Sequence, residues 1–198
     1  MMKKRRMVKV YRFIAIKHFY NLAGYLLPIL AVFVLILGTY GSIGGLYLAP
    51  ADYQQGDAFR IIYVHVPSAF LSLFIYLVMA MAAVIGLIFR IKLADLIVSG
   101  SVFLGSWFTF LALLTGSVWA KPMWGAWWVW DARLTSELIL LFLYLGVIAL
   151  RSAIPEPRVA AKATAVLLML GLANIPIIHY SVYWWNSLLQ GATIHLLS

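Results

Sequence analysis

The chain contains no cysteine in its 198 residues, so neither a disulfide nor a thiolate metal site is possible. It is also poor in charge: 11% of its residues are charged, whereas soluble domains average about a quarter. Three signatures of hydrolytic enzymes are absent from the sequence, namely the Walker A loop, the His-Glu-x-x-His zinc motif and the Gly-x-Ser-x-Gly elbow. We therefore expect no ATP hydrolysis by this chain alone, and nothing in it favours a hydrolase.

Hydrophobic residues make up 65% of the chain. Five apolar runs are near or above the roughly 20 residues that a helix needs to cross a bilayer. The predicted spans are residues 22–47, 64–89, 96–118, 134–150 and 159–182. These runs are continuous and do not alternate with period two, which favours helices over a β-barrel. We predict an all-α integral membrane protein, a polytopic bundle of five transmembrane helices that forms one domain over residues 1–198.

The basic residues predict how this bundle is oriented. Twelve of the fifteen lysines and arginines lie in the N-terminal tail or after the second and fourth spans. They are Lys3, Lys4, Arg5, Arg6, Lys9, Arg12, Lys17, Arg90, Lys92, Arg151, Arg158 and Lys162. Arg60, Lys121 and Arg133 belong to the other side. The positive-inside rule then predicts a cytoplasmic N-terminus, and the net charge of +9 indicates membrane topology rather than binding to nucleic acid.

Residues 119–131, on the predicted outer side, hold five of the eight tryptophans. These are Trp119, Trp124, Trp127, Trp128 and Trp130, and Asp131 follows them. The segment is too short and too interrupted by glycine and proline to be another span. One or two tryptophans would be ordinary at a membrane interface, but five together favour a shaped apolar surface for a flat ligand. Asp131 is also predicted to cap the fourth span.

Two histidines lie at the predicted level of these tryptophans. His65 is at the start of the second span, and His179 is near the end of the fifth. Each could be an ordinary interfacial residue, or the two could bind one metal together, since imidazole is a common axial ligand of haem iron. Pro176 is predicted to kink the fifth span. That kink either turns His179 toward the bundle axis or serves packing alone.

The three cations predicted on the outer side have two possible roles. Arg60, Lys121 and Arg133 could bind the carboxylates of a ligand, such as haem propionates, or could pair with nearby acids of the chain. The possible acidic partners are Asp52, Asp57, Asp131 and Glu137.

Glycines within the spans are predicted to allow close helix approach. They are Gly38, Gly41, Gly45, Gly100 and Gly105.

Residues 124–131, WGAWWVWD, look like the WGxWWxWD signature of the WWD superfamily of haem-handling proteins. Longer stretches resemble the haem exporter protein C (CcmC) family of the cytochrome c maturation pathway known as system I. They are residues 49–56 (APADYQQG), 60–67 (RIIYVHVP), 116–124 (GSVWAKPMW) and 177–186 (IIHYSVYWWN). The resemblance covers most of the chain, from about residue 22 to residue 193.

This resemblance implies that haem b is carried as a ligand at the periplasmic face of the bacterial inner membrane. The tryptophan segment would hold it, with His65 and His179 as the axial ligands. The haem would then be presented to the chaperone CcmE, which binds it covalently. The other implied partners are the small protein CcmD and the ABC transporter subunits CcmA and CcmB. ATP hydrolysis by the transporter subunits would release the loaded chaperone. The chain would thus be a transport and chaperone component rather than an enzyme. Members of the family usually have six spans.

Two alternatives remain open from the sequence. A b-type cytochrome subunit would also use paired histidines, to carry electrons through a permanent haem. Such carriers often stack two haems across the membrane, whereas no second pair of histidines is present on the inner side. A purely structural transporter subunit would use the tryptophans only as an interfacial belt.

Overall fold

The computed structural model describes residues 16–184, so the tail before Ile16 and the C-terminal residues 185–198 lie outside the description. The described elements are helical. In chain order they are α2 (Ile16–Ile43), the π-helical turn η1 (Gly44–Leu48), the 3-10 helix η2 (Asp57–Ile61), α3 (Ile62–Phe89), α4 (Lys92–Trp124), α5 (Ala132–Ala153), α6 (Pro157–Gly171) and α7 (Asn174–Trp184). Five helical segments, with α6 and most of α7 forming one of them, are long and apolar enough to cross a membrane. The predicted all-α, multi-span architecture is confirmed.

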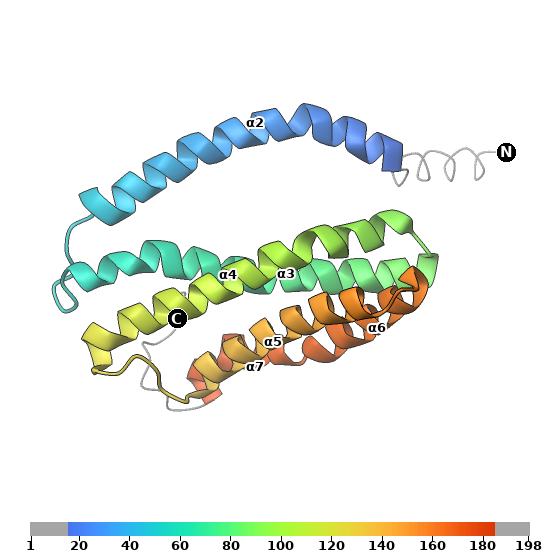
Figure 1. Ribbon diagram of the computed structural model, residues 1–198. Helices are drawn as coiled ribbons and strands as arrows, with labels where there is room; N and C mark the ends of the chain where they lie inside the picture. Colours follow the sequence, from blue (N-terminus) through green and yellow to red (C-terminus); the bar gives the residue numbers. More distant parts are fainter. Residues whose placement is uncertain (1–15, 185–198) are drawn as a thin grey trace.

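The helices from α3 to α7 form a bundle, and α2 arches away from it (Figure 1). α3 and α4 lie antiparallel, α5 packs against α4, and α6 and α7 pack against α5. By contrast, no side chain of α2 is buried. α2 is connected to the rest through η1, which contacts η2 at the beginning of α3. The bundle therefore consists of the last four predicted spans.

Two tyrosines occupy the centre of the bundle. Within a bilayer, helices associate through close packing and interhelical hydrogen bonds, because lipid is as apolar as the side chains. Tyr76 of α3 and Tyr144 of α5 meet edge to face with their ring centroids 5.4 Å apart, and neither is exposed. The Tyr144 hydroxyl donates to the carbonyl of Ser72 at 2.7 Å. This contact joins α3 to α5 through a buried polar group that is satisfied.

Each central tyrosine lies against a glycine of another helix. A Cβ at Gly105 of α4 would collide with the ring of Tyr144, and one at Gly171 of α6 with Tyr76. Of the glycines predicted to allow close approach, Gly105 and also Gly45, which faces Tyr63, do so. The other three, Gly38, Gly41 and Gly100, would place a Cβ with nothing within 4 Å.

The structure corrects the predicted boundary before the tryptophan segment. α4 runs six residues beyond the predicted end at 118, so that Trp119 and Trp124 belong to the helix and not to a loop. The helix ends because Gly125 takes the left-handed conformation, with φ 75°, and donates its N–H to the Lys121 carbonyl at 3.0 Å. Pro122 is tolerated because it removes only one backbone donor near the end of the helix.

Where a kink was predicted in the fifth span, the structure has a break in the helix, which falls before Pro176 itself. α6 ends at Gly171 and α7 begins at Asn174. Leu172 is four residues before the proline, and a proline ring clashes with the carbonyl at that position in a continuous helix. The helix therefore breaks over residues 172–173.

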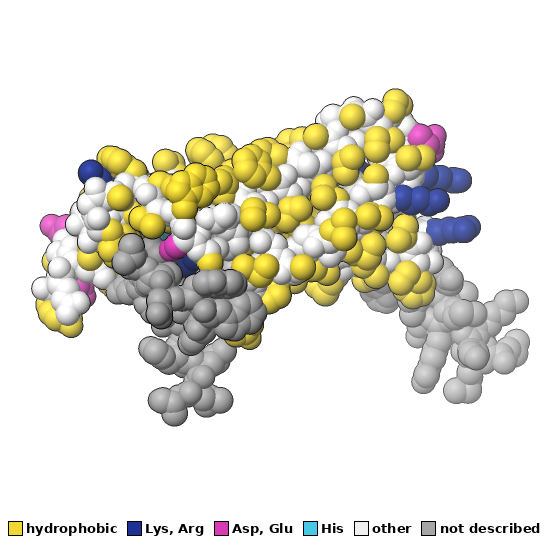
Figure 2. All heavy atoms as spheres, turned by 90° about the horizontal axis from the view of Figure 1, so that it is seen from below, with side chains coloured by type: hydrophobic (Ala, Val, Ile, Leu, Met, Phe, Trp, Pro, Cys, Tyr) yellow, Lys and Arg dark blue, Asp and Glu magenta, His cyan; other side chains and the backbone are white. Residues whose placement is uncertain are grey.

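The two ends of the bundle differ in charge. Five basic residues after the second and fourth spans lie at one end, which we call the basic end. They are Arg90, Lys92, Arg151, Arg158 and Lys162. Figure 2 shows Lys and Arg side chains gathered at this end. The tryptophan segment, the start of α3 and helix α7 all lie at the other end (Figure 1), which we call the tryptophan end. His65 and His179 thus share one end of the bundle, as the spacing of the spans predicted.

Candidate functional site

The loop between η1 and η2 brings a glutamine side chain to the tryptophan segment. Asp52 organises this loop, because its Oδ1 accepts the backbone N–H groups of Gln54 at 2.9 Å and Gln55 at 2.8 Å. Gly56, with φ 58°, closes the turn through paired backbone hydrogen bonds with Asp52. The Gln55 side chain then accepts the indole N–H of Trp119 at 3.0 Å. A local turn thereby fixes one tryptophan.

His65 is held in one orientation by α4. Its Nδ1 lies 3.0 Å from the Ala112 carbonyl and 3.1 Å from the Thr115 hydroxyl. A carbonyl can only accept, so in the neutral ring Nδ1 carries the proton and Nε2 keeps its lone pair. Gly116 allows this close approach, since a Cβ there would lie 3.1 Å from His65 Cε1. In metal sites, a backbone carbonyl that accepts one ring N–H of a histidine orients the other nitrogen toward the metal in this same way.

The five tryptophans differ in exposure. Trp119 is buried and lies edge-on to His65, with ring centroids 5.8 Å apart. Trp124 and Trp128 are half-buried. Trp127 is 58% exposed and Trp130 is 76% exposed. The ring of Trp130 meets that of Trp128 edge to face, with the ring centroids 5.4 Å apart. The segment therefore has an inner part that packs on His65 and an outer part that presents two indoles.

Two buried polar atoms of this segment have no hydrogen-bond partner. They are the indole Nε1 of Trp128 and Oδ2 of Asp131. A buried polar group without a partner costs about 1–3 kcal/mol. The other oxygen of Asp131 is engaged, because Oδ1 accepts the Leu134 N–H at 2.8 Å as the N-cap of α5. The predicted cap is confirmed, and the remaining donor and acceptor fit a site that a ligand completes.

The cap and the free oxygen of Asp131 can be separated by substitution. Asp131→Ala removes the cap, and we expect it to cost about 1 kcal/mol and to lower the thermal midpoint in detergent by roughly 2–4 °C. Asp131→Asn keeps a side-chain carbonyl for Leu134 and should unfold within about 1 °C of the parent chain. An asparagine variant as unstable as the alanine variant would show that the carboxylate charge, and not the cap, stabilises α5.

His179 is placed by a hydrogen bond at the start of α7. The Asn174 side-chain amide donates to the Ser136 carbonyl of α5 at 2.8 Å and is buried. This contact fixes α7 on α5. Ile178 and Ser181 are buried on that side of the helix, whereas His179 is exposed and meets the ring of Tyr180, 4.8 Å away. The break in the span therefore leaves His179 on the exposed side of α7 and does not turn it into the packed core.

The three cations of the tryptophan end have different surroundings. Arg60 forms an ion pair with Asp57 at 3.0 Å and donates to the Leu46 and Tyr47 carbonyls, each at 2.9 Å. It therefore ties η1 to η2, and one of its predicted acidic partners is confirmed. Lys121 is exposed, donates to the Gly125 carbonyl at 2.9 Å and lies 6.0 Å from the centre of the Trp127 ring.

Arg133, in the first turn of α5, is the cation that lies near half-buried His65 and buried Glu137. It interacts electrostatically with both His65 and Glu137. Glu137 is buried, and its Oε1 accepts the Ser72 hydroxyl of α3 at 2.8 Å. A carboxyl group inside a membrane span is costly and is a functional suspect by default. His65 of α3 thus lies between residues of two other helices, with Trp119 of α4 beside its ring and Arg133 of α5 nearby.

Comparison with known proteins identifies the family. The family model described as "Heme exporter protein C", CcmC, matches residues 9–198. The chain belongs to the CcmC family. A "Heme exporter protein C" of Escherichia coli K12 is 56% identical over 174 residues, which are 88% of this chain and 71% of that protein. The protein of the same name in Haemophilus influenzae is 53% identical over 175 residues, with the same coverage. The resemblance stated from the motifs is thus confirmed.

Relatives of this family extend beyond bacteria. A protein of Marchantia polymorpha whose name describes it as a ccmC-like mitochondrial protein of cytochrome c biosynthesis is 45% identical over 162 residues. They are 82% of this chain and 67% of that relative. The helical bundle described above is thus the fold of a chain that belongs to the CcmC family.

The structure adds three residues to the candidate site of this CcmC chain that the sequence did not single out. Gln55 holds Trp119, while Ala112 and Thr115 hold His65. Gln55 lies in the motif at residues 49–56, so its presence there was a usable signal. Ala112 acts through its backbone carbonyl, which has no signature in the sequence, and a threonine within an apolar span is too common to be one.

Proposed function

We propose that the chain binds haem b as a transported ligand at its tryptophan end and hands it on during cytochrome c maturation. His65 carries this proposal. Its Nδ1 is fixed on the Ala112 carbonyl at 3.0 Å, which leaves Nε2 as the donor atom for iron. A histidine that is already oriented loses little freedom on binding, so it contributes more to affinity than a mobile one. Because the chain belongs to a family named for haem export, haem is the ligand that we propose.

The remaining residues have distinct roles in this proposal. His179, exposed at the same end of the bundle, supplies the second axial ligand. Trp128 and Asp131 offer the donor and the acceptor that have no partner within the protein. Trp119 and Trp124 form the inner wall, and Trp127 and Trp130 cover the ligand from outside. Lys121, beside the exposed Trp127, and Arg133, in the first turn of α5, are the cations that we assign to the propionates.

Two features support transfer rather than permanent storage. Trp127 and Trp130 are largely exposed, so a partner can reach the edge of the site without unfolding the bundle. One of the two proposed ligands, His179, is also exposed, and such a ligand can be released first. The recipient in this proposal is the chaperone CcmE, with CcmA, CcmB and CcmD as the other members of the complex. The basic end then faces the cytoplasm and the tryptophan end the periplasm of the bacterial inner membrane.

The experiment that tests this function measures haem binding and transfer. The purified chain in detergent, titrated with haem, should give the absorption spectrum of a six-coordinate, bis-histidine haem. Mixing the loaded chain with CcmE that carries no haem should move haem to CcmE, detected as haem that stays on CcmE after denaturing electrophoresis. Haem that cycles rapidly with a quinol and is not transferred would instead identify an electron carrier.

His179→Ala should have a partial effect. Because His65 keeps its orientation, we expect the haem affinity to fall by roughly tenfold and the spectrum to become five-coordinate. His18→Ala is the matched control, since it removes an imidazole from α2, outside the bundle. Unchanged binding and spectrum for His179→Ala would exclude it as an iron ligand, and an equal loss for His18→Ala would show that the effect is not specific.

A further inference from the structure

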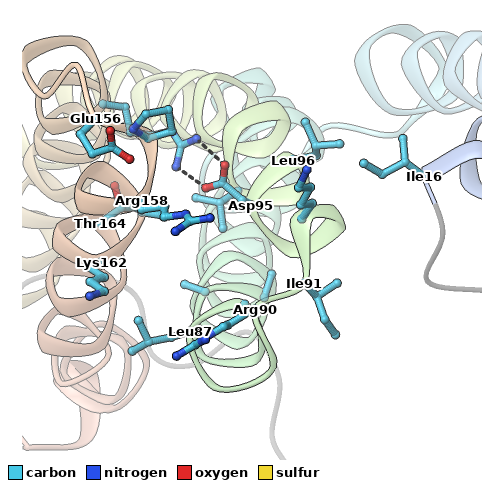
Figure 3. A pocket seen from close by; sticks show the side chains of 18 residues that line it. Ile16, Leu87, Arg90, Ile91, Asp95, Leu96, Glu156, Arg158, Lys162 and Thr164 are labelled. Atoms are coloured by element: carbon cyan, nitrogen blue, oxygen red, sulfur yellow. Dashed lines mark hydrogen bonds and ion pairs between the residues drawn. The ribbon is translucent and has the colours of Figure 1, made fainter. Parts of the chain in front are cut away.

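A cavity of about 790 Å³ lies at the basic end, where α3, α4 and α6 meet (Figure 3). One side of it is apolar, with Ala82, Ala83, Leu87 and Leu96 among its lining residues. The other side is strongly cationic. The charged residues that line it are Arg90, Lys92, Arg151, Arg158 and Lys162, with Asp95 and Glu156 as the acids. Five positive and two negative charges thus border one hydrophobic wall.

One cation of this cavity is committed to a partner within the protein. Arg151 forms a two-pronged ion pair with Asp95, at 2.9 and 3.3 Å, and also donates to Ser99. The other four cations make no ion pair with any residue in the part of the chain that the structure describes. Figure 3 shows that three of these, Arg90, Arg158 and Lys162, surround the open space from different sides. Their charge is available to an anion.

Thr164 in the wall of the cavity supplies a second, independent observation. It is 1% exposed, and its hydroxyl has no hydrogen-bond partner. Serines and threonines inside helices commonly satisfy themselves by donating to a carbonyl three or four residues back. Thr109 and Thr115 of α4 do so at 2.8 and 2.7 Å, whereas Thr164 does not. A buried donor at the edge of a cationic cavity is the polar group that a bound oxyanion would satisfy.

We propose that this cavity binds the phosphate group of an anionic phospholipid, with the acyl chains against its apolar wall. Basic pockets between membrane helices bind such headgroups through Lys and Arg, and Arg pairs with phosphate oxygens in a bidentate way. α6 begins at Pro157 beside the cavity, so the positive end of its helix dipole adds to the field. No histidine, methionine, cysteine or tyrosine is among the lining residues. The cavity therefore lacks the usual ligands for haem iron, which favours phosphate over haem.

Native mass spectrometry of the full chain tests this site. The protein is exchanged into mixed micelles of phosphatidylglycerol and phosphatidylcholine with the same acyl chains, and the retained lipids are counted. Phosphatidylglycerol should be retained preferentially. Arg158→Gln and Lys162→Gln should each reduce its retention about fivefold, and the double variant about twenty-five-fold. Both residues are exposed, so these variants should fold and bind haem as the parent chain does.

Lys121→Gln is the matched control, because it removes one exposed lysine from the tryptophan end, and it should leave lipid retention unchanged. Thr164→Val should weaken retention with no change in charge. Equal retention of both lipids, or full retention by the double variant, would overturn the proposal. Competition by glycerol phosphate at concentrations equal to those of the lipid would assign the cavity to a soluble phosphate. Loss of haem from the double variant with lipid retention intact would assign it to haem.

Discussion

His65→Ala should abolish the haem complex that we propose for this chain. The side chain is held by the Ala112 carbonyl at 3.0 Å and lies against the buried Trp119 ring, so it is the ligand of the proposed site that the protein itself keeps in position. Changes to groups that only orient a ligand typically cost 10–100-fold in affinity. Loss of His65, the ligand that the protein holds in place, should exceed about 100-fold and so cost more than loss of the exposed His179. Titration of the purified chain with haem, followed by absorption spectroscopy, measures this directly.

Two further variants distinguish a ligand from a residue that only supports the fold. Thr115→Val removes one of the two contacts to Nδ1 but leaves the Ala112 carbonyl, so the affinity should fall by no more than about tenfold. Added imidazole should restore a six-coordinate spectrum to His65→Ala but should not alter a chain that is merely misfolded. If His65→Ala gives the parent spectrum and affinity, the proposed ligand and the function that depends on it are wrong.

Gly105→Ala should strongly destabilise the bundle. The new Cβ would collide with the ring of Tyr144. That ring cannot turn away, because its hydroxyl is bonded to the Ser72 carbonyl at 2.7 Å and its edge meets Tyr76. Overpacking of this kind costs about 1–3 kcal/mol or more, which corresponds to a fall of roughly 2–12 °C in the thermal midpoint for a chain of this size.

Gly100→Ala is the matched control on the same helix. A Cβ at this position has nothing within 4 Å, and both substitutions gain the same helix propensity, up to about 1 kcal/mol. The difference between the two thermal midpoints therefore isolates the collision. Replacing Tyr144 by leucine in the Gly105→Ala background should recover part of the loss. Equal midpoints for Gly105→Ala and Gly100→Ala would show that α4 and α5 can separate freely at this point.

The sequence predicted the features that depend on residue type and local spacing. Long apolar runs define the spans, because each backbone polar group must be satisfied inside the membrane by a helix. An aspartate directly before the fourth span predicted the N-cap, since only a short acceptor side chain reaches the N–H groups of the first turn. The alternation of basic and tryptophan-rich loops placed His65 and His179 at one end. These inferences need no knowledge of how the helices pack.

Tertiary structure alone decided which of those residues come together in the candidate site. Nδ1 of His65 is fixed by a carbonyl 47 positions away, and Trp119 by a side chain 64 positions away. The tertiary structure also places α2 apart from the bundle. It pairs Arg60 with Asp57 and leaves His179 on the exposed side of α7. The orientation of a side chain depends on the partner that meets it across helices. Hydropathy and periodicity describe each helix by itself, so they cannot specify such partners.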